Sequence, residues 1–194
     1  MTALLRALAD AYREGGVDAL ATEADRRMPP EGGHGWVDEL IAGCGDPEFS
    51  VPASWLLLRH ARSGRAIPAA SVERLARRGL DADPHERDPH ERAPYENDPV
   101  DARLHLAQLI QHLEIPATCA KPLAEFLTNG CQSEHAFLRA WAMDGLYRLS
   151  LQHPRYEEPA RRALEAGADD PKASVRARAR RIVSEEAKRQ RKSR

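Results

Sequence analysis

Two histidines with neighbouring carboxylates are the first residues in this chain whose types and spacing could bind a metal. His85, Glu86, His90 and Glu91 belong to the pentapeptide DPHER, which occurs twice in tandem over residues 83–92. A zinc site needs three or four such ligands held in a fixed tetrahedron. The prolines and alternating charges instead predict an exposed loop. Because such a loop is a poor frame for a metal, we expect a solvated segment here.

A second pair of histidines, His105 and His112, lies seven residues apart in a segment that we expect to be helical. Seven residues are about two helical turns, so both rings would share a face and lie about 10 Å apart along the axis. That distance is too large for one ion, and we expect packing in the core or along a groove wall. No HExxH, GxSxG or glycine-rich phosphate loop occurs. We therefore predict no metal, no cofactor and no enzymatic activity.

Tryptophan and arginine side chains are candidates for binding a partner. The chain has three tryptophans, Trp36, Trp55 and Trp141. Trp141 is close in sequence to Arg139 and Asp144, and exposed tryptophan with arginine is a common composition of an interface hot spot. A buried tryptophan that covers the core would explain the same position, so both interpretations stay open.

Basic residues are concentrated at the C-terminal end. Residues 172–194 contain ten Lys and Arg against two Asp and Glu, whereas residues 1–98 contain 12 against 18. A basic stripe could neutralise phosphates and bind nucleic acid in a salt-dependent way. The alternative is that a last helix exposes one face to water and needs charge there to stay in solution. The nucleic-acid interpretation would use Arg176, Arg180, Lys188, Arg189, Arg191 and Lys192.

A helix that recurs along the chain must position these side chains. It reads DPVDARLHLAQLIQHL from Asp98, SEHAFLRAWAMDGLYRL from Ser133 and DPKASVRARARRIV from Asp170. Each copy begins with a capping residue, continues with an apolar residue before arginine, and then places Ala, Leu or Ile at helical spacing. The arginines of these steps are 36 and 37 residues apart. A helical period near 40 residues is typical of an α-solenoid.

Each recurring helix is preceded by a shorter one, so we predict about four helix pairs. Gly15 and Gly16 are expected to end the first helix of an N-terminal cap. We predict a single all-α domain over residues 1–194, a right-handed α-α superhelix. Its predicted parts are the cap and linker (1–35), the paired helices (36–188), an inserted loop (81–98) and a basic tail (189–194).

The composition fits this helical prediction. Charged residues make up 30% of the chain and aromatic residues 5%, whereas strands favour β-branched and aromatic side chains. No apolar run approaches the roughly 20 residues of a membrane span. Cys44, Cys119 and Cys131 show no CxxC spacing, which argues against a disulfide framework and a zinc finger. We expect a protein of the reducing cytoplasm.

The Asp-Pro turn followed by Val-Arg and small apolar residues resembles a HEAT repeat. DDPKASVRARARRIV matches that pattern best, and the resemblance covers roughly residues 36–188. The first unit departs from it, since DPEFSVPASWLLLRHAR places Trp55 near the position where arginine is expected. The resemblance implies a solenoid whose concave face binds a protein, a peptide or, in some members, nucleic acid. It also implies that Arg103, Arg139 and Arg176 bond to acidic or backbone groups of a neighbouring unit.

HEAT-like proteins include lyases that attach bilins and DNA glycosylases that use an aspartate in the groove, which makes Asp144 a candidate by resemblance. The chain has no motif specific to either group. We predict a non-catalytic scaffold that binds a protein partner and no membrane. Nucleic-acid binding through the basic end is the alternative, with base excision as its remote extension, and a regulatory subunit with an acidic docking half is a third class. The predicted protein-binding residues are Arg103, His105, Arg139, Trp141 and Arg148.

Overall fold

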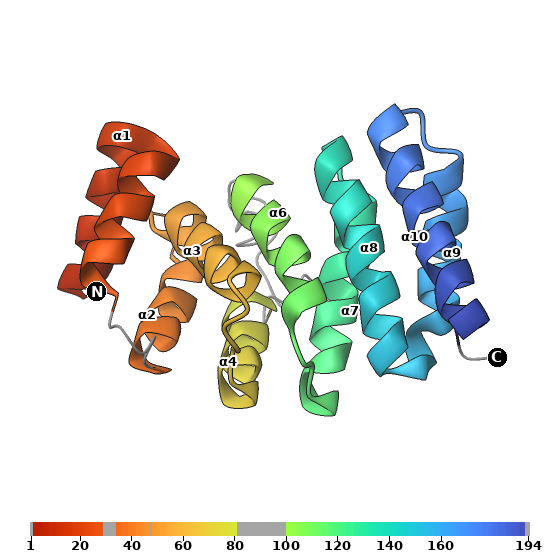
Figure 1. The fold of residues 1–194 in the computed structure, drawn as a ribbon, viewed down its shortest axis with the longest axis horizontal. Coiled ribbons are helices and arrows are strands. Elements are labelled where there is room, and N and C mark those ends of the chain that lie inside the picture. Colours follow the sequence, from red (N-terminus) through yellow and green to blue (C-terminus); the bar gives the residue numbers. More distant parts are fainter. Residues whose placement is uncertain (1, 29–33, 47, 81–99, 193–194) are drawn as a thin grey trace, which may run out of the picture.

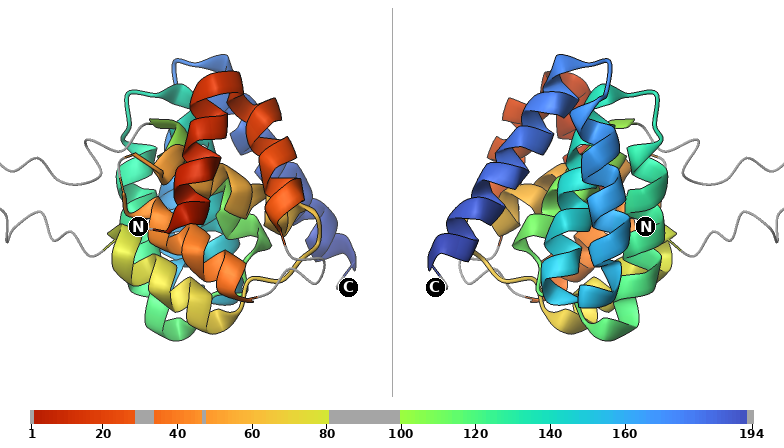
Figure 2. Two further views of the ribbon diagram at one scale, coloured as in Figure 1. Left: turned by 90° about the vertical axis from the view of Figure 1, so that its left-hand side faces the viewer. Right: turned by 90° about the vertical axis from the view of Figure 1, so that its right-hand side faces the viewer.

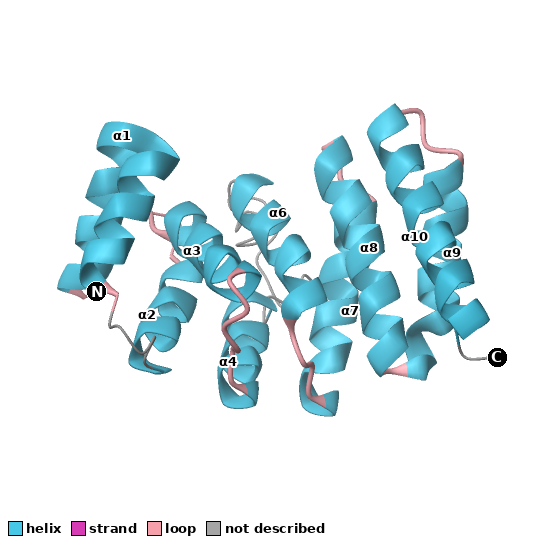
Figure 3. Cartoon of the chain, viewed as in Figure 1, coloured by secondary structure: helices cyan, strands magenta, loops and turns pink. Residues whose placement is uncertain are grey.

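The computed structural model describes residues 2–28, 34–46, 48–80 and 100–192. Within these ranges the chain consists of helices joined by short loops, and it contains no strand (Figure 3). The prediction of an all-α fold is therefore confirmed. The DPHER tandem and the rest of the predicted inserted loop lie outside the described residues. None of the described helices is both long enough and apolar enough to cross a membrane.

The helices form two rows that run along the molecule (Figure 1). The first-helix row consists of α2 (His34–Cys44), α4 (Ala69–Leu80), α7 (Ala117–Cys131) and α9 (Glu157–Ala168). The second-helix row consists of α3 (Ser50–Arg62), α6 (Val100–Leu109), α8 (Ala136–Gln152) and α10 (Ala173–Lys192). Consecutive helices contact each other within each row, and α3, α8 and α10 also contact the first-row helices that precede them. The buried apolar side chains of these helices thus pack against neighbouring helices.

The N-terminal helix α1 (Ala3–Arg27) is two helical arms that fold back on each other (Figure 2). The break is at Gly15 and Gly16, where Gly16 has a φ of 65°, a conformation that favours glycine. The predicted stop at this pair is confirmed. Thr2 at the start of the first arm donates to Glu39 of α2, and Asp25 of the second arm binds Arg59 of α3. The cap therefore continues both rows.

Three of the turns between paired helices contain the same type of hydrogen bond. The side chains of Asp46, Ser133 and Asp170 accept from the backbone N–H two residues further on, at 2.9, 3.2 and 2.8 Å. These residues cap turns, and α8 and α10 begin only at Ala136 and Ala173. The predicted helix starts at Ser133 and Asp170 were therefore too early, because a turn-capping side chain resembles a helix cap in sequence.

Small residues allow the two helices of a pair to approach closely. A Cβ on Gly130 of α7 would lie 2.7 Å from the Cβ of Ala142 on α8. In α2, a Cβ on Gly43 would lie 3.0 Å from the Cβ of Ala53 on α3. Glycine near the end of a first helix and alanine in the next helix thus define the crossing point of these pairs.

The C-terminal boundary differs from the prediction. Helix α10 continues to Lys192, so residues 189–192 are helical rather than part of a separate tail.

Two 3₁₀ turns, Ile110–His112 and Pro154–Tyr156, follow α6 and α8. The main core extends from α1 to α9, and a smaller cluster around Met143, Val175 and Ile182 joins α8 to α10.

Candidate functional site

Arg139, which the sequence singled out twice, connects two consecutive units. Its guanidinium donates two hydrogen bonds to the carboxylate of Asp170, at 2.8 and 2.9 Å, and two to the carbonyls of Ser133 and Glu134. Its pair with Asp170 holds the pKa of that carboxyl below its ordinary value. The expected role in joining units is confirmed for Arg139, whose donors are engaged within the protein.

The other two repeat arginines differ from Arg139. Arg176 donates to the carbonyls of Asp170 and Pro171, so it stabilises the turn of its own unit. The Nε atom of Arg103 on α6 is buried and has no hydrogen-bond partner among the described residues. In the first unit, Pro52 stands six residues after Asp46, where Arg176 stands after Asp170. Trp55 therefore lies three residues after the position that corresponds to Arg176, which agrees with the expectation that it lies near the arginine position.

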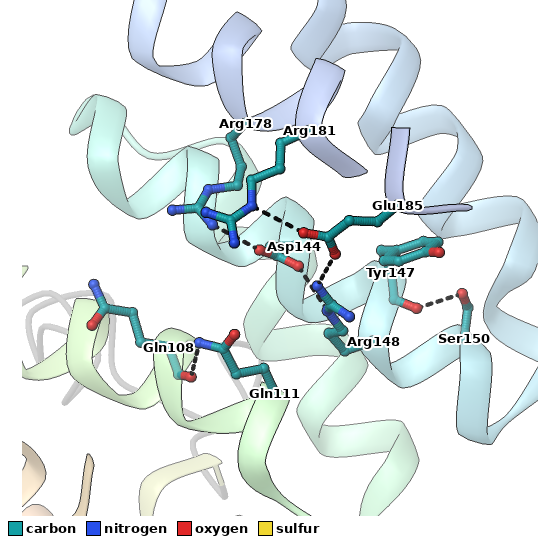
Figure 4. A network of polar contacts seen from close by, with 9 residues as sticks. All are labelled: Gln108, Gln111, Asp144, Tyr147, Arg148, Ser150, Arg178, Arg181 and Glu185. Carbon is teal, nitrogen blue, oxygen red and sulfur yellow. Dashed lines mark hydrogen bonds and ion pairs between the residues drawn. The ribbon is translucent and has the colours of Figure 1, made fainter. Parts of the chain in front are cut away.

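A cluster of charged side chains lies between α8 and α10, and we call it the α8–α10 cluster. Asp144 is 3% exposed, and its two oxygens accept from Arg148 and Arg178, each at 3.1 Å. Arg148 also binds Glu185 at 2.5 Å, and Arg181 binds the other oxygen of Glu185 at 2.9 Å. Figure 4 shows the three guanidinium groups turned toward these two carboxylates. The α8–α10 cluster comprises Trp141, Asp144, Arg148, Arg178, Arg181 and Glu185.

Trp141 orders one arginine of the α8–α10 cluster. The guanidinium carbon of Arg178 lies 3.6 Å from the centroid of the Trp141 ring, which is a close cation–π contact. Trp141 is half-buried and packs on the main core. Trp141 therefore packs on the core, as one interpretation expected, and its ring also carries the cation of Arg178; its role in binding a partner stays a prediction.

The pKa shifts in the α8–α10 cluster follow from its ion pairs. Burial works against the charged form of Arg148, but Asp144 and Glu185 outweigh it and raise the pKa of Arg148. For Glu185, burial alone would raise the pKa, whereas hydrogen bonds from Arg181 and Arg148 lower it below the ordinary value. The α8–α10 cluster contains three arginines and two carboxylates. It therefore carries a net positive charge at neutral pH.

The remaining predicted protein-binding residue, His105, lies between α6 and α3. Its Nδ1 is 3.1 Å from the hydroxyl of Ser54. Burial lowers the pKa of His105 below the ordinary value, which favours the neutral ring at pH 7. His105 therefore contributes to the contact between second-row helices. Among the described residues, no three His, Cys, Asp or Glu side chains gather in a way that could hold a metal.

The predicted nucleic-acid residues are spread around α10. Arg176 is half-buried and bound to its turn, whereas Arg180, Lys188, Arg189, Arg191 and Lys192 are exposed. At about 100° per residue, residues 180, 188 and 191 lie within about 80° of one another, whereas Arg189 lies on the opposite side of the helix from Arg180. The basic residues therefore do not form a single stripe.

The two rows differ in charge. Within the bounds of the described helices, the second-helix row has 13 Lys and Arg against four Asp and Glu, and the first-helix row has six against seven. Eight of those 13 basic residues are on α10. A charge that is concentrated on one row gives that row a field that attracts acidic partners.

Sequence reasoning missed Arg178, Arg181 and Glu185. A signal was present, since Asp144 and Arg178 are 34 residues apart and Arg148 and Glu185 are 37 apart. These separations are close to the repeat period. Polar residues one period apart on consecutive second helices are therefore expected to face each other.

A scan against protein-family models and searches of curated proteins and solved structures found no match for this chain.

Proposed function

We propose that the chain is a HEAT-like α-solenoid that acts as a non-catalytic binding module, and that its second-helix row binds an acidic segment of a partner protein. The two rows of paired helices and the turn-to-arginine contacts of Arg139 support a stacked repeat. Such stacks present long helical surfaces to partners.

The observation that carries this proposal is the difference in charge between the two rows. The second-helix row has a large excess of basic residues, and the first-helix row is close to neutral. Charge complementarity steers association and selects among partners. An acidic protein segment is therefore the partner that this row fits.

The residue types on the second-helix row favour a protein over nucleic acid. On this row the half-buried Trp141 has the guanidinium of Arg178 over its ring, at 3.6 Å from the ring centroid. Tryptophan and arginine dominate protein hot spots. The same row contains the carboxylates of Asp144 and Glu185 in the α8–α10 cluster, and they would repel a continuous line of phosphates.

The second candidate function is nucleic-acid binding, and the eight basic residues of α10 favour it. Phosphate contacts would make the affinity fall steeply with salt. A base-excision activity would in addition need an available carboxylate. Both oxygens of Asp144 accept from arginines, so this carboxylate first supports the contact between α8 and α10.

The test compares an acidic peptide with a nucleic acid of the same charge. Fluorescence anisotropy would measure binding of a labelled decaglutamate peptide and of an oligothymidylate with ten phosphates. Arg181→Gln and Arg77→Gln form a matched pair, because these arginines are 68% and 72% exposed and each pairs with a glutamate one helical turn away. Arg181 is on the second-helix row and Arg77 on the first.

We expect Arg181→Gln to weaken peptide binding about two- to fivefold, as for an exposed ion pair, and Arg77→Gln to leave it unchanged. Equal losses in the two variants would contradict binding by the second-helix row. Tighter, strongly salt-dependent binding of the oligothymidylate would instead support the nucleic-acid function.

A further inference from the structure

We infer that Arg178 is the anchor of this binding surface and takes a carboxylate of the acidic partner on the free edge of its guanidinium. The inference rests on the proposed function and assigns one residue and one ligand chemistry within it.

Arg178 keeps most of its guanidinium donors available to a ligand. Among the described residues it makes one hydrogen bond, from Nη1 to Asp144, and one ring contact, with Trp141. A guanidinium has five N–H donors, so most of them have no protein acceptor. The remaining nitrogens of Arg178 are not among the buried atoms that lack a partner, which means that they reach solvent.

The side chain of Arg178 is already ordered by its neighbours. Its side chain is only 18% exposed, its plane is fixed by the indole of Trp141, and one edge is held by Asp144. A partner therefore gains hydrogen bonds without the entropy cost of ordering a long side chain. Free surface arginines do not offer this advantage.

Two other ordered arginines differ from Arg178, because their donors are occupied by protein acceptors. Arg139 makes four hydrogen bonds to Asp170 and to two carbonyls. Arg59 also lies over a tryptophan, but both of its terminal nitrogens bind Asp25, each at 2.8 Å. Arg139 and Arg59 hold helices together, whereas Arg178 has the same order and spare donors.

The chemistry of the ligand follows from the shape and charge of the site. The planar fork of arginine matches the two oxygens of a carboxylate. Asp144 and Glu185 neutralise two of the three arginines in the α8–α10 cluster. One positive charge therefore remains for an incoming group. A single glutamate or aspartate side chain satisfies that charge. Nucleic-acid interfaces are much more positively charged than this.

The first experiment observes Arg178 in the unmodified protein. Arginine side-chain Nε–H signals would be recorded by ¹H–¹⁵N NMR during a titration with decaglutamate peptide. We expect the Arg178 signal to shift in a saturable way, and the Arg139 signal to stay in place as an internal control. A titration in which the signals of exposed Arg180 and Arg191 shift and that of Arg178 does not would overturn the inference.

The second experiment uses Arg178→Lys, which keeps the charge beside Asp144 and Trp141 but removes the planar fork. We expect peptide affinity to fall roughly tenfold, the value of one charge-assisted hydrogen bond. Arg59→Lys is the matched control, and its affinity is expected to remain within about twofold of the wild type, because the donors of Arg59 already serve Asp25.

The outcomes separate the inference from the function on which it rests. Equal losses for Arg178→Lys and Arg59→Lys, with peptide binding retained in the wild type, would refute the anchor and leave the binding face intact. A shift of the Arg178 signal with oligothymidylate but not with decaglutamate would refute the proposed acidic protein partner. Such a result would assign the site to phosphate.

Discussion

The pair between Arg139 and Asp170 is expected to contribute substantially to stability, and Asp170→Asn tests this. The two side chains are 16% and 10% exposed and share two hydrogen bonds at 2.8 and 2.9 Å. Removing one partner of a fully buried ion pair costs about 3–5 kcal/mol, and this part-buried pair is expected to lose less. Asparagine still accepts from the backbone N–H of Lys172 and from Arg139, so we expect a loss of about 2 kcal/mol in the free energy of unfolding.

The pH dependence of this loss has a definite sign. Arg139 lowers the pKa of Asp170 in the folded state below its ordinary value of 3.8. The stabilisation is therefore present above the unfolded pKa and is lost as the pH falls through the folded pKa. The difference between the wild type and Asp170→Asn should be full at pH 7 and should shrink below about pH 4.

Urea unfolding followed by the helical circular-dichroism signal would measure this difference at several pH values. The control is Asp169→Asn, which removes the same charge at the preceding residue. Asp169 is exposed, and its side chain makes no hydrogen bond or ion pair among the described residues, so we expect a change within about 0.5 kcal/mol. Equal effects of the two substitutions at pH 7, or a loss in Asp170→Asn that persists unchanged at pH 2, would refute the reasoning.

Two further predictions concern the close helix crossing and a partly buried thiol. Gly130→Ala places a Cβ 2.7 Å from the Cβ of Ala142 and should lower the free energy of unfolding by about 1–3 kcal/mol through overpacking. Gly35→Ala is the control, because no atom lies within 4 Å of its new Cβ, and it should be neutral or stabilising. Thermal unfolding would measure both variants, and similar melting temperatures would contradict the packing argument. Cys131 is partly buried, and this burial raises the pKa of its thiol to about 12. Ellman's reagent at pH 8 should therefore modify this thiol more slowly in the folded than in the unfolded protein. The difference between the wild type and Cys131→Ser isolates the rate of Cys131, and equal rates in the two states would contradict the argument.

The sequence predicted the elements whose causes are local. Gly15 and Gly16 break α1 because glycine adopts conformations that other residues avoid. Arg139 was expected to join units, and it reaches the turn residue of the next one. Within the described residues, the helices after the cap alternate between the two rows, as expected for successive helix pairs.

Features that depend on neighbouring helices were not predictable from the pattern alone. Ser133 and Asp170 were interpreted as helix caps, although they cap turns and the helices α8 and α10 begin three residues later. The exposure of Trp141 depends on where α10 lies. Arg178 belongs to a run of similar arginines, and only its position opposite Asp144 and Trp141 distinguishes it from them.

The central claim is that the second-helix row binds an acidic protein, and photo-crosslinking in the source cells tests it most directly. A photoreactive phenylalanine derivative would replace Arg62 or Gln108 on the second-helix row, and Arg77 or Glu125 on the first. We predict crosslinks from the two second-row positions to one protein, through a peptide rich in Asp and Glu, and none from the first row. Crosslinks that arise only from the first row, or that join the second row to nucleic acid, would contradict the account.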